Sequence, residues 1–199
     1  DPQGDKERTE YRDYTTELPY SEPYAPSVAT NEYLYYRDTF YWDKKAMAEG
    51  YPDVHAAHIY HWLHDGSMAG RILESEKLPY ETRKYYTYAA ISGSSTSTTG
   101  ISMIPGMNRS PCRVAQVVAD ANGAPVDQVT HNTYDGSGNL IGSTDPLGRQ
   151  TTYVYATNEI DLLETRQSTG SSSYDVLSSA TYNAQHLPLT MTDGAGQAT

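Results

Sequence analysis

The stretch "YDGSGNLIGSTDPLGRQTTYVY" (134–155) places two turn motifs around a short segment of alternating residues. In Asp-Pro-Leu-Gly at 145–148, proline presets φ at the second turn position, and the aspartate can accept hydrogen bonds from the backbone ahead of it. Glycine then tolerates a positive φ where the turn ends. In the segment that follows, Thr151, Tyr153 and Tyr155 share one face of a strand. The stretch therefore predicts antiparallel hairpins joined by tight turns.

The same turn motif recurs along the chain, which indicates an internal repeat. Residues 134–151 align with residues 182–199, and the N-terminal "DPQG" and the internal "DANG" (120–123) have the same turn chemistry. We interpret these residues as corners of a meander rather than as a catalytic or ligand site. The turn residues assigned in this way are Asp1, Gly4, Asp120, Gly123, Tyr134, Asp135, Gly138, Asp145, Pro146, Gly148, Tyr182, Asp193 and Gly196.

The overall charge and composition exclude several classes of function. The 199 residues carry 25 acidic and 14 basic side chains, for a formal net charge of −11. A phosphate-binding surface needs a stripe of basic residues, so this balance argues against nucleic-acid binding and against docking to an anionic membrane. No apolar run approaches the ~18 residues of a membrane span. The single cysteine, Cys112, permits no internal disulfide, and the charged start of the chain lacks the apolar core of a signal peptide.

Tyrosine dominates the aromatic residues, with 19 Tyr against one Phe and two Trp. If all these rings were exposed, too little apolar material would remain to form a core. We therefore expect most tyrosine rings to be buried, with each hydroxyl hydrogen-bonded to a partner or in contact with water at the surface.

The chain divides into three parts by composition. Residues 1–91 are an irregular Tyr-rich segment, residues 92–110 form a Ser/Thr/Gly-rich loop, and residues 111–199 hold the regular repeats. Within the first part, the aromatic run at 33–43 predicts a strand, and 44–50 predicts one or two helical turns. Residues 58–75 predict a hairpin with Asp65-Gly66 at its turn.

Four histidines with a spacing of three residues, His55, His58, His61 and His64, form the cluster most suggestive of chemistry. On a helix, this spacing would spread them around the surface. On a strand, His58 and His64 would share one face with Tyr60 and Trp62, while His61 would point to the opposite face. Neither geometry brings three ligands together. The sequence therefore predicts no metal, no cofactor and no catalytic residues.

The turn motifs resemble those of the Rhs repeat family, also called YD-repeats, of bacterial polymorphic toxins, toxin-complex C subunits and teneurins. The resemblance rests on Tyr134-Asp135, Gly138-Asn139 and the D-x-x-G turn at 145–148, and it extends over 112–199. One unit departs from the pattern, with Tyr182-Asn183 in place of Tyr-Asp. The resemblance implies an all-β fold in which antiparallel hairpin repeats form a section of a spiralling β-shell around a toxin or other cargo.

The expected function is therefore structural: a section of an Rhs repeat shell that encloses and helps deliver a C-terminal toxin domain encoded elsewhere. The partners would be neighbouring repeats and the cargo of the same parent chain, in a larger bacterial protein that is secreted or cell-surface associated. Two alternatives stay open. In one, the repeats bind carbohydrate at a cell surface, which an exposed aromatic ridge around 33–43 would favour. In the other, the chain is an enzyme fragment that uses the His55–His64 cluster.

Overall fold

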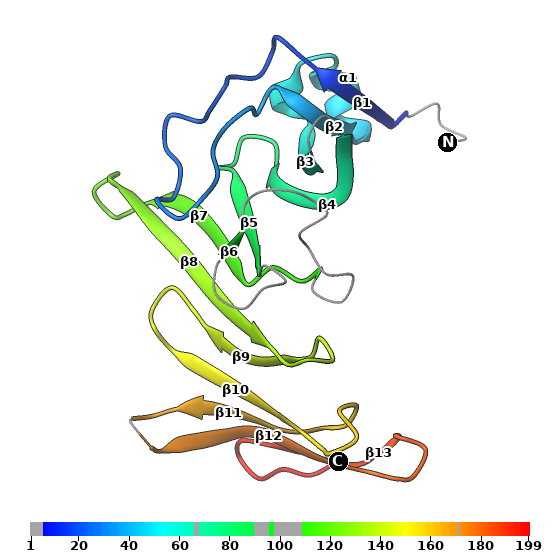
Figure 1. The fold of residues 1–199 in the computed structure, drawn as a ribbon, viewed down its shortest axis with the longest axis vertical. Helices are drawn as coiled ribbons and strands as arrows, with labels where there is room; N and C mark the ends of the chain where they lie inside the picture. The colour runs from blue at the N-terminus through cyan, green and yellow to red at the C-terminus, as the bar shows by residue number, and fades with distance from the viewer. Residues whose placement is uncertain (1–5, 66–67, 90–95, 98–108, 171) are drawn as a thin grey trace. The chain divides into compact units, whose positions relative to one another are not determined.

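The computed structural model describes residues 6–65, 68–89, 96–97, 109–170 and 172–199. These residues form an open antiparallel sheet whose strands follow chain order (Figure 1). The all-β prediction of antiparallel hairpins is confirmed. By its internal contacts the chain divides into unit 1, Asp1–Gln128, and unit 2, Val129–Thr199. Of the described helices, none has the length and apolar character needed to cross a membrane.

The elements of unit 1 are β1 (Arg8–Tyr14), β2 (Tyr36–Trp42), α1 (Lys44–Glu49), the short 3-10 helix η1 (Val54–Ala56), β3 (His58–Asp65), β4 (Met68–Lys77), β5 (Lys84–Ala89), β6 (Thr96–Ser97) and β7 (Arg113–Ala119). Strand β8 (Pro125–Tyr134) crosses the boundary between the units. Unit 2 continues with β9 (Leu140–Thr144), β10 (Gln150–Tyr155), β11 (Leu162–Ser168), β12 (Tyr174–Tyr182) and β13 (Pro188–Asp193). The short strand β6 pairs with β5 but is not part of the series of neighbouring strands that runs from β1 to β13.

The local predictions for unit 1 are largely confirmed. The helical turns at 44–50 are α1, with Asp43 accepting a hydrogen bond from the Ala46 N–H and Gly50 at the C-terminal end. The predicted hairpin at 58–75 is the β3–β4 pair, although Gly66 at its turn lies outside the described residues. The strand predicted at 33–43 begins later, at Tyr36, because Tyr33 has a φ of 57° and turns the chain before β2.

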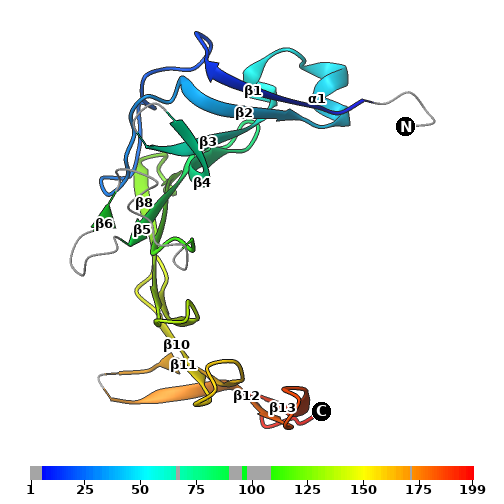
Figure 2. The same ribbon diagram turned by 45° about the vertical axis from the view of Figure 1, so that its right-hand side comes forward.

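The hydrophobic core of unit 1 forms where one face of the sheet is covered. Alternation along β2 buries Phe40 and Trp42, and the paired strand β3 adds Ile59. The residues between β1 and β2, called here the 15–35 segment, add Leu18 to the same cluster, and residues 54–57 complete it. Helix α1 lies beside β2 (Figures 1 and 2). This core holds the 15–35 segment against the sheet at one end.

Unit 2 is built differently. Among the described residues, every buried hydrophobic side chain belongs to unit 1. In unit 2 the strands β9 to β13 form a single layer, and Leu189 and Met191 on β13 are 62% and 57% exposed. Hydrogen bonds between strands and within turns therefore carry most of the cohesion of this unit.

The expectation that most tyrosine rings are buried is wrong for a large subset. Tyr85 and Tyr88 are buried as expected. Eight others are exposed, and three of these, Tyr14, Tyr20 and Tyr33, pack on other tyrosine rings at the surface instead of entering the core. The exposed tyrosines are Tyr11, Tyr14, Tyr20, Tyr24, Tyr33, Tyr51, Tyr80 and Tyr174.

Candidate functional site

The turns of the repeat share one hydrogen-bond pattern. In the 145–149 turn, Asp145 Oδ1 accepts hydrogen bonds from the backbone N–H groups of Leu147 and Arg149, at 2.9 and 3.0 Å. Asp120, Asp135 and Asp193 make the same two bonds, to the residues two and four positions ahead. The bonds from Ala124 and Asn122 lower the pKa of Asp120, because they stabilise its charged form.

Each of these turns places its glycine in the left-handed region. The φ angles are 81° at Gly123, 89° at Gly138, 81° at Gly148 and 79° at Gly196. Pro146 lies at the second position of its turn, between Asp145 and Leu147. Tyr134 and Tyr182 end the strands that enter their turns, and the Tyr182 hydroxyl donates to the Leu162 carbonyl at 3.1 Å. Asp1 and Gly4 lie outside the described residues.

The unit that departs from the motif keeps the same geometry with other residues. Asn183 Oδ1 accepts hydrogen bonds from the Gln185 and Leu187 N–H groups, at 2.9 and 3.0 Å. His186 takes the glycine position with a φ of 61°. Asn183 and His186 were missed by our assignment from sequence. Two signals could have found them. Asparagine and histidine tolerate a positive φ, and the side-chain oxygen of asparagine can accept backbone hydrogen bonds as that of aspartate does.

Side-chain links join successive turns along one edge of unit 2, where the turns 135–139, 156–161 and 183–187 follow one another (Figure 1). Asn139 Nδ2 donates to the Glu159 carbonyl at 2.8 Å. His186 Nδ1 lies 3.1 Å from Asp161 Oδ1, and Asn158 Nδ2 donates to the other oxygen of that carboxylate at 2.7 Å. We call this series the turn ladder. It explains why an asparagine follows the glycine in the motif: its side chain reaches the next turn on the same edge.

Unit 1 contains a buried polar row across four strands. The strand registers place Asp38 opposite His61, His61 opposite Ser75, and Ser75 opposite Tyr85. Asp38, His61 and Ser75 are each 0% exposed. His61 Nδ1 lies 3.0 Å from Asp38 Oδ1, and His61 Nε2 lies 3.3 Å from Glu74 Oε2. Both ring nitrogens therefore face carboxylates.

Arg37 adds a guanidinium to this row, with its Nη2 at 3.2 Å from His61 Nε2. Its φ of 60° breaks the alternation of β2, so that the consecutive residues Arg37 and Asp38 are both buried. Arg37 Nη2 lies 3.3 Å from Glu74 Oε2, and Arg37 Nε donates to the Trp62 carbonyl at 3.0 Å. From β4, Ser75 Oγ accepts from Arg83 Nη1 at 3.1 Å. We call Arg37, Asp38, His61, Glu74, Ser75 and Arg83 the His61 network.

Burial and pairing act in opposite directions on the titration of this network. Burial lowers the pKa of His61, but the hydrogen bonds and charges of Asp38 and Glu74 outweigh it, and the pKa of His61 is raised. For Asp38 the balance is the reverse. Burial raises the pKa of its carboxyl, and this effect is larger than the lowering by the hydrogen bond and charge of His61. Arg37 Nη2 lies 3.2 Å from His61 Nε2 and can donate to it, so a neutral imidazole that donates from Nδ1 to Asp38 also satisfies these contacts.

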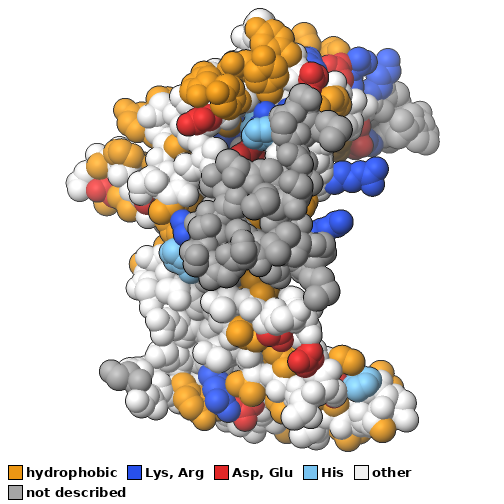
Figure 3. Space-filling view, viewed as in Figure 1, with side chains coloured by type: hydrophobic (Ala, Val, Ile, Leu, Met, Phe, Trp, Pro, Cys, Tyr) orange, Lys and Arg blue, Asp and Glu red, His pale blue; other side chains and the backbone are white. Residues whose placement is uncertain are grey.

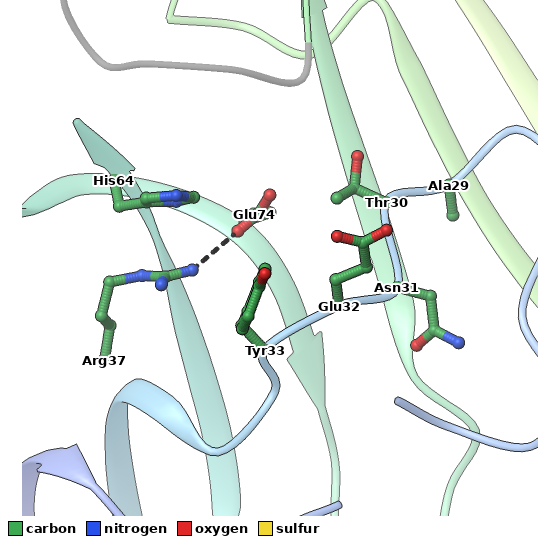
Figure 4. Close-up of a pocket in the computed structure, with 8 residues that line it drawn as sticks. All are labelled: Ala29, Thr30, Asn31, Glu32, Tyr33, Arg37, His64 and Glu74. Atoms are coloured by element: carbon green, nitrogen blue, oxygen red, sulfur yellow. Dashed lines mark hydrogen bonds and ion pairs between the residues drawn. The ribbon is translucent and has the colours of Figure 1, made fainter. Parts of the chain in front are cut away.

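A cavity of about 500 Å³ opens beside the network. The segment 29–33 forms one wall, and Arg37, His64 and Glu74 form the other (Figure 4). Arg37 points toward Glu74, and the second oxygen of Glu74 is turned away from it, toward the side of the cavity with Thr30. The charged groups of this wall are paired with one another or with the main chain. His61 offers neither ring nitrogen to the cavity, so it cannot act there as a general base.

The four histidines singled out from the sequence lie in different surroundings. His55 is exposed on η1, and His58 pairs with Glu76 at 3.1 Å on the half-exposed face of β3. His61 is buried within the network, and His64 lines the cavity. Among the described residues, no group of three or more His, Cys, Asp or Glu side chains could hold a metal ion.

The fold and its turns define a class: a repeat protein built as an antiparallel meander whose corners are capped by Asp or Asn. Residues 134–172, which contain the Asp135 and Asp145 turns, match the family described as RHS Repeat. This segment of the chain is therefore an RHS repeat, also called a YD-repeat.

The crystal structure of TcdB2-TccC3-Cdc42 is similar over 74% of this chain, at 17% sequence identity and a TM-score of 0.43. This chain spans 9% of the length of the matched chain. No curated protein matches the chain.

Proposed function

We propose that this chain is a section of the wall of an RHS-type β-shell that encloses a toxin domain of the same parent polypeptide. In this role the chain acts through structure, without catalysis of its own. Its partners are the neighbouring repeats and the enclosed cargo, in a bacterial protein that is secreted or displayed at the cell surface and acts in competition between bacteria.

The single observation that carries the proposal is the construction of unit 2. Its sheet is one layer thick, and Leu177, Leu189 and Met191 are all more than 40% exposed. Sheets normally cover an apolar face with a second layer, and single repeats rely on their neighbours in the same way. Capped turns and the turn ladder hold such a layer in register without a core of its own. These are the properties that the wall of a hollow compartment requires.

Deletion of residues 145–192 from the parent protein tests the proposal. The deletion joins Thr144 to Asp193, which opens an equivalent turn. It removes β10, β11, β12 and nearly all of β13, an even number of strands, so the direction of the remaining strands is kept. We expect the shell to lose closure and the cargo to become sensitive to added protease, while the isolated toxin domain keeps its toxicity.

Leu147→Ser provides the matched control, because Leu147 is 79% exposed at the tip of a turn inside the deleted region. This variant should protect the cargo as well as the unchanged protein does. A deletion variant whose cargo stays fully protected, or toxicity of the 199-residue segment alone, contradicts the shell proposal.

A second candidate function is the binding of carbohydrate at a cell surface, which a cluster of tyrosines in unit 1 favours. Tyr14, Tyr35 and Tyr36 lie with ring centroids 4.6–5.7 Å apart, and Tyr20 and Tyr33 extend the cluster. Hydrophobic side chains are exposed at this end of unit 1 (Figure 3). Thr15 and Thr16 lie with three of these rings around a shallow cavity of about 450 Å³. Sugar rings stack on aromatic side chains and bond to hydroxyls, so the cluster has the required chemistry.

Glycan-array binding tests this second candidate. Tyr20→Ala should weaken any glycan binding by about tenfold, the scale of one lost aromatic contact. Tyr80→Ala, which changes a more exposed tyrosine outside the cluster, should leave it unchanged. The absence of glycan binding by the unchanged protein, or equal effects of the two variants, argues against a sugar site.

A further inference from the structure

We propose that the cavity beside the His61 network binds a primary ammonium group on an aliphatic stem, held between the carboxylates of Glu32 and Glu74. Lysine side chains and small alkylamines carry this group. The inference goes beyond the wall function and is independent of it, because it rests on the residues of one cavity within unit 1.

Glu74 is the buried carboxylate of the cavity, with a side chain that is 5% exposed. Its Oε2 lies 3.3 Å from both Arg37 Nη2 and His61 Nε2. Its Oε1 is turned away from Arg37 toward the cavity (Figure 4), and it makes no hydrogen bond within the described residues. A carboxylate oxygen only accepts hydrogen bonds, and a buried acceptor without a donor is unfavourable. A ligand group that occupies this position must therefore be a donor.

Arg37 does not oppose a cation here, because its charge is already paired. Its Nη2 contacts Glu74 and His61, and its Nε donates to the Trp62 carbonyl at 3.0 Å. The charges of Arg37 and Glu74 thus balance each other. Glu32, on the other wall, forms no ion pair within the part of the chain that the structure describes. It therefore adds a negative charge that a cationic ligand can balance.

Acceptors face the cavity from both of its walls. Glu32 lies at the exposed side, opposite Glu74. Tyr33 is 44% exposed, and Figure 4 shows its side chain directed toward the space between the two carboxylates. The side chain of Asn31 points away, because its amide is bonded to the main chain of Glu22. Two carboxylates and one hydroxyl thus remain for a ligand.

This set of acceptors favours an ammonium group over other cations. An ammonium has three donors that rotate to meet separate acceptors. A guanidinium binds best to two oxygens of one carboxylate, and Arg37 already contacts Oε2 of Glu74. Among the described residues, no group of three His, Cys, Asp or Glu side chains could hold a metal ion. The volume of about 500 Å³ lies within the ~300–1,000 Å³ of ligand pockets and leaves space for an aliphatic stem.

The backbone at Tyr33 and Arg37 indicates that the walls are formed in advance. Their φ angles are 57° and 60°, a conformation that is unfavourable for bulky residues. These conformations occur once on each wall of the cavity. Strained backbone of this kind is concentrated at ligand-binding sites, where the surrounding structure holds it. The cavity therefore needs no large rearrangement to accept a ligand.

An NMR titration of the 199-residue chain with n-butylammonium tests the proposal. The amide signals of residues 30–33 and of Glu74 should shift saturably, whereas n-butanol, which has the same stem without the charge, should not shift them. Glu32→Gln should weaken the binding by about tenfold, the scale of one charge-assisted hydrogen bond. Because Glu32 is exposed, this variant tests the site without changing a buried contact.

Glu81→Gln is the matched control, because it removes the same charge from an exposed residue of unit 1 that does not line the cavity. It should bind n-butylammonium as tightly as the unchanged chain. Equal weakening by Glu81→Gln and Glu32→Gln would indicate general attraction to an acidic chain and would overturn the proposal. Equal shifts with n-butanol, or no saturable shift at residues 30–33, would overturn it as well.

A lysine blocked at both ends, Nα-acetyl-lysine N-methylamide, distinguishes the two sources of the ammonium group. Tighter binding of the blocked lysine than of n-butylammonium supports the proposal and assigns the site to a lysine side chain of a protein. The reverse order supports it and assigns the site to a free amine. Failure of both probes to bind overturns it, whatever the outcome for the shell.

Discussion

Replacement of Arg37 by methionine should lower the free energy of unfolding of unit 1 by about 3–5 kcal/mol, the scale for removing one partner of a buried ion pair. The side chains of Arg37 and Glu74 are 9% and 5% exposed, so solvent screens their interaction little. Without the guanidinium, buried Glu74 would lose its ion pair, and the Trp62 carbonyl and His61 Nε2 would lose a donor. Urea denaturation followed by tryptophan fluorescence measures the loss.

Arg71→Met is the matched control, because Arg71 is exposed on β4, the strand that carries Glu74. Its effect should stay within about 0.5 kcal/mol, as for most surface substitutions. Adding Glu74→Gln to Arg37→Met should cost less than the sum of the two single changes, since the second change removes the unpaired charge. Equal effects of Arg37→Met and Arg71→Met would show that the ion pair contributes nothing.

The second large effect is expected at a corner of unit 2, where Gly148→Val should cost about 1–3 kcal/mol, the range for a strained backbone conformation. A Cβ added at Gly148 would meet no atom within 4 Å, so the cost comes from its φ of 81° and not from a clash. A β-branched residue is especially unfavourable at positive φ. Chemical denaturation monitored by circular dichroism measures the change.

Gly136→Val supplies the comparison in the neighbouring turn. Gly136 likewise has open space around it but does not have a positive φ. Its substitution should therefore cost much less than that of Gly148. If the two variants unfold at the same denaturant concentration, the left-handed conformation is not what requires glycine at this corner.

The corners could be predicted from the sequence because turn chemistry is local. Asp145, Pro146 and Gly148 lie within four residues, and their roles follow from side-chain reach and backbone freedom alone. The family match over 134–172 falls on the same segment. The α1 helix and the β3–β4 hairpin followed from similarly short signals.

The His61 network could not be predicted, because it depends on strand register between residues distant in the chain. Strand alternation separated buried His61 from half-exposed His58, yet it could not indicate that Asp38 and Glu74 would lie on either side of the ring. The positive φ of Arg37 also breaks the alternation from which burial is inferred. The exposure of Tyr14, Tyr20 and Tyr33 could not be predicted for a related reason, since packing of one ring on another at the surface has no sequence period.

The turn ladder makes the two edges of unit 2 unequal in their tolerance of change. Asn139, Asp161 and His186 bond from one turn to the next, so an inserted residue in any of these turns would break contacts in two places. On the opposite edge, Asp145 pairs with Arg149 inside its own turn at 2.6 Å. An inserted loop or a fused tag at 145–149 would disturb one corner only. Added sequence, whether gained in evolution or by engineering, is best accommodated on that edge.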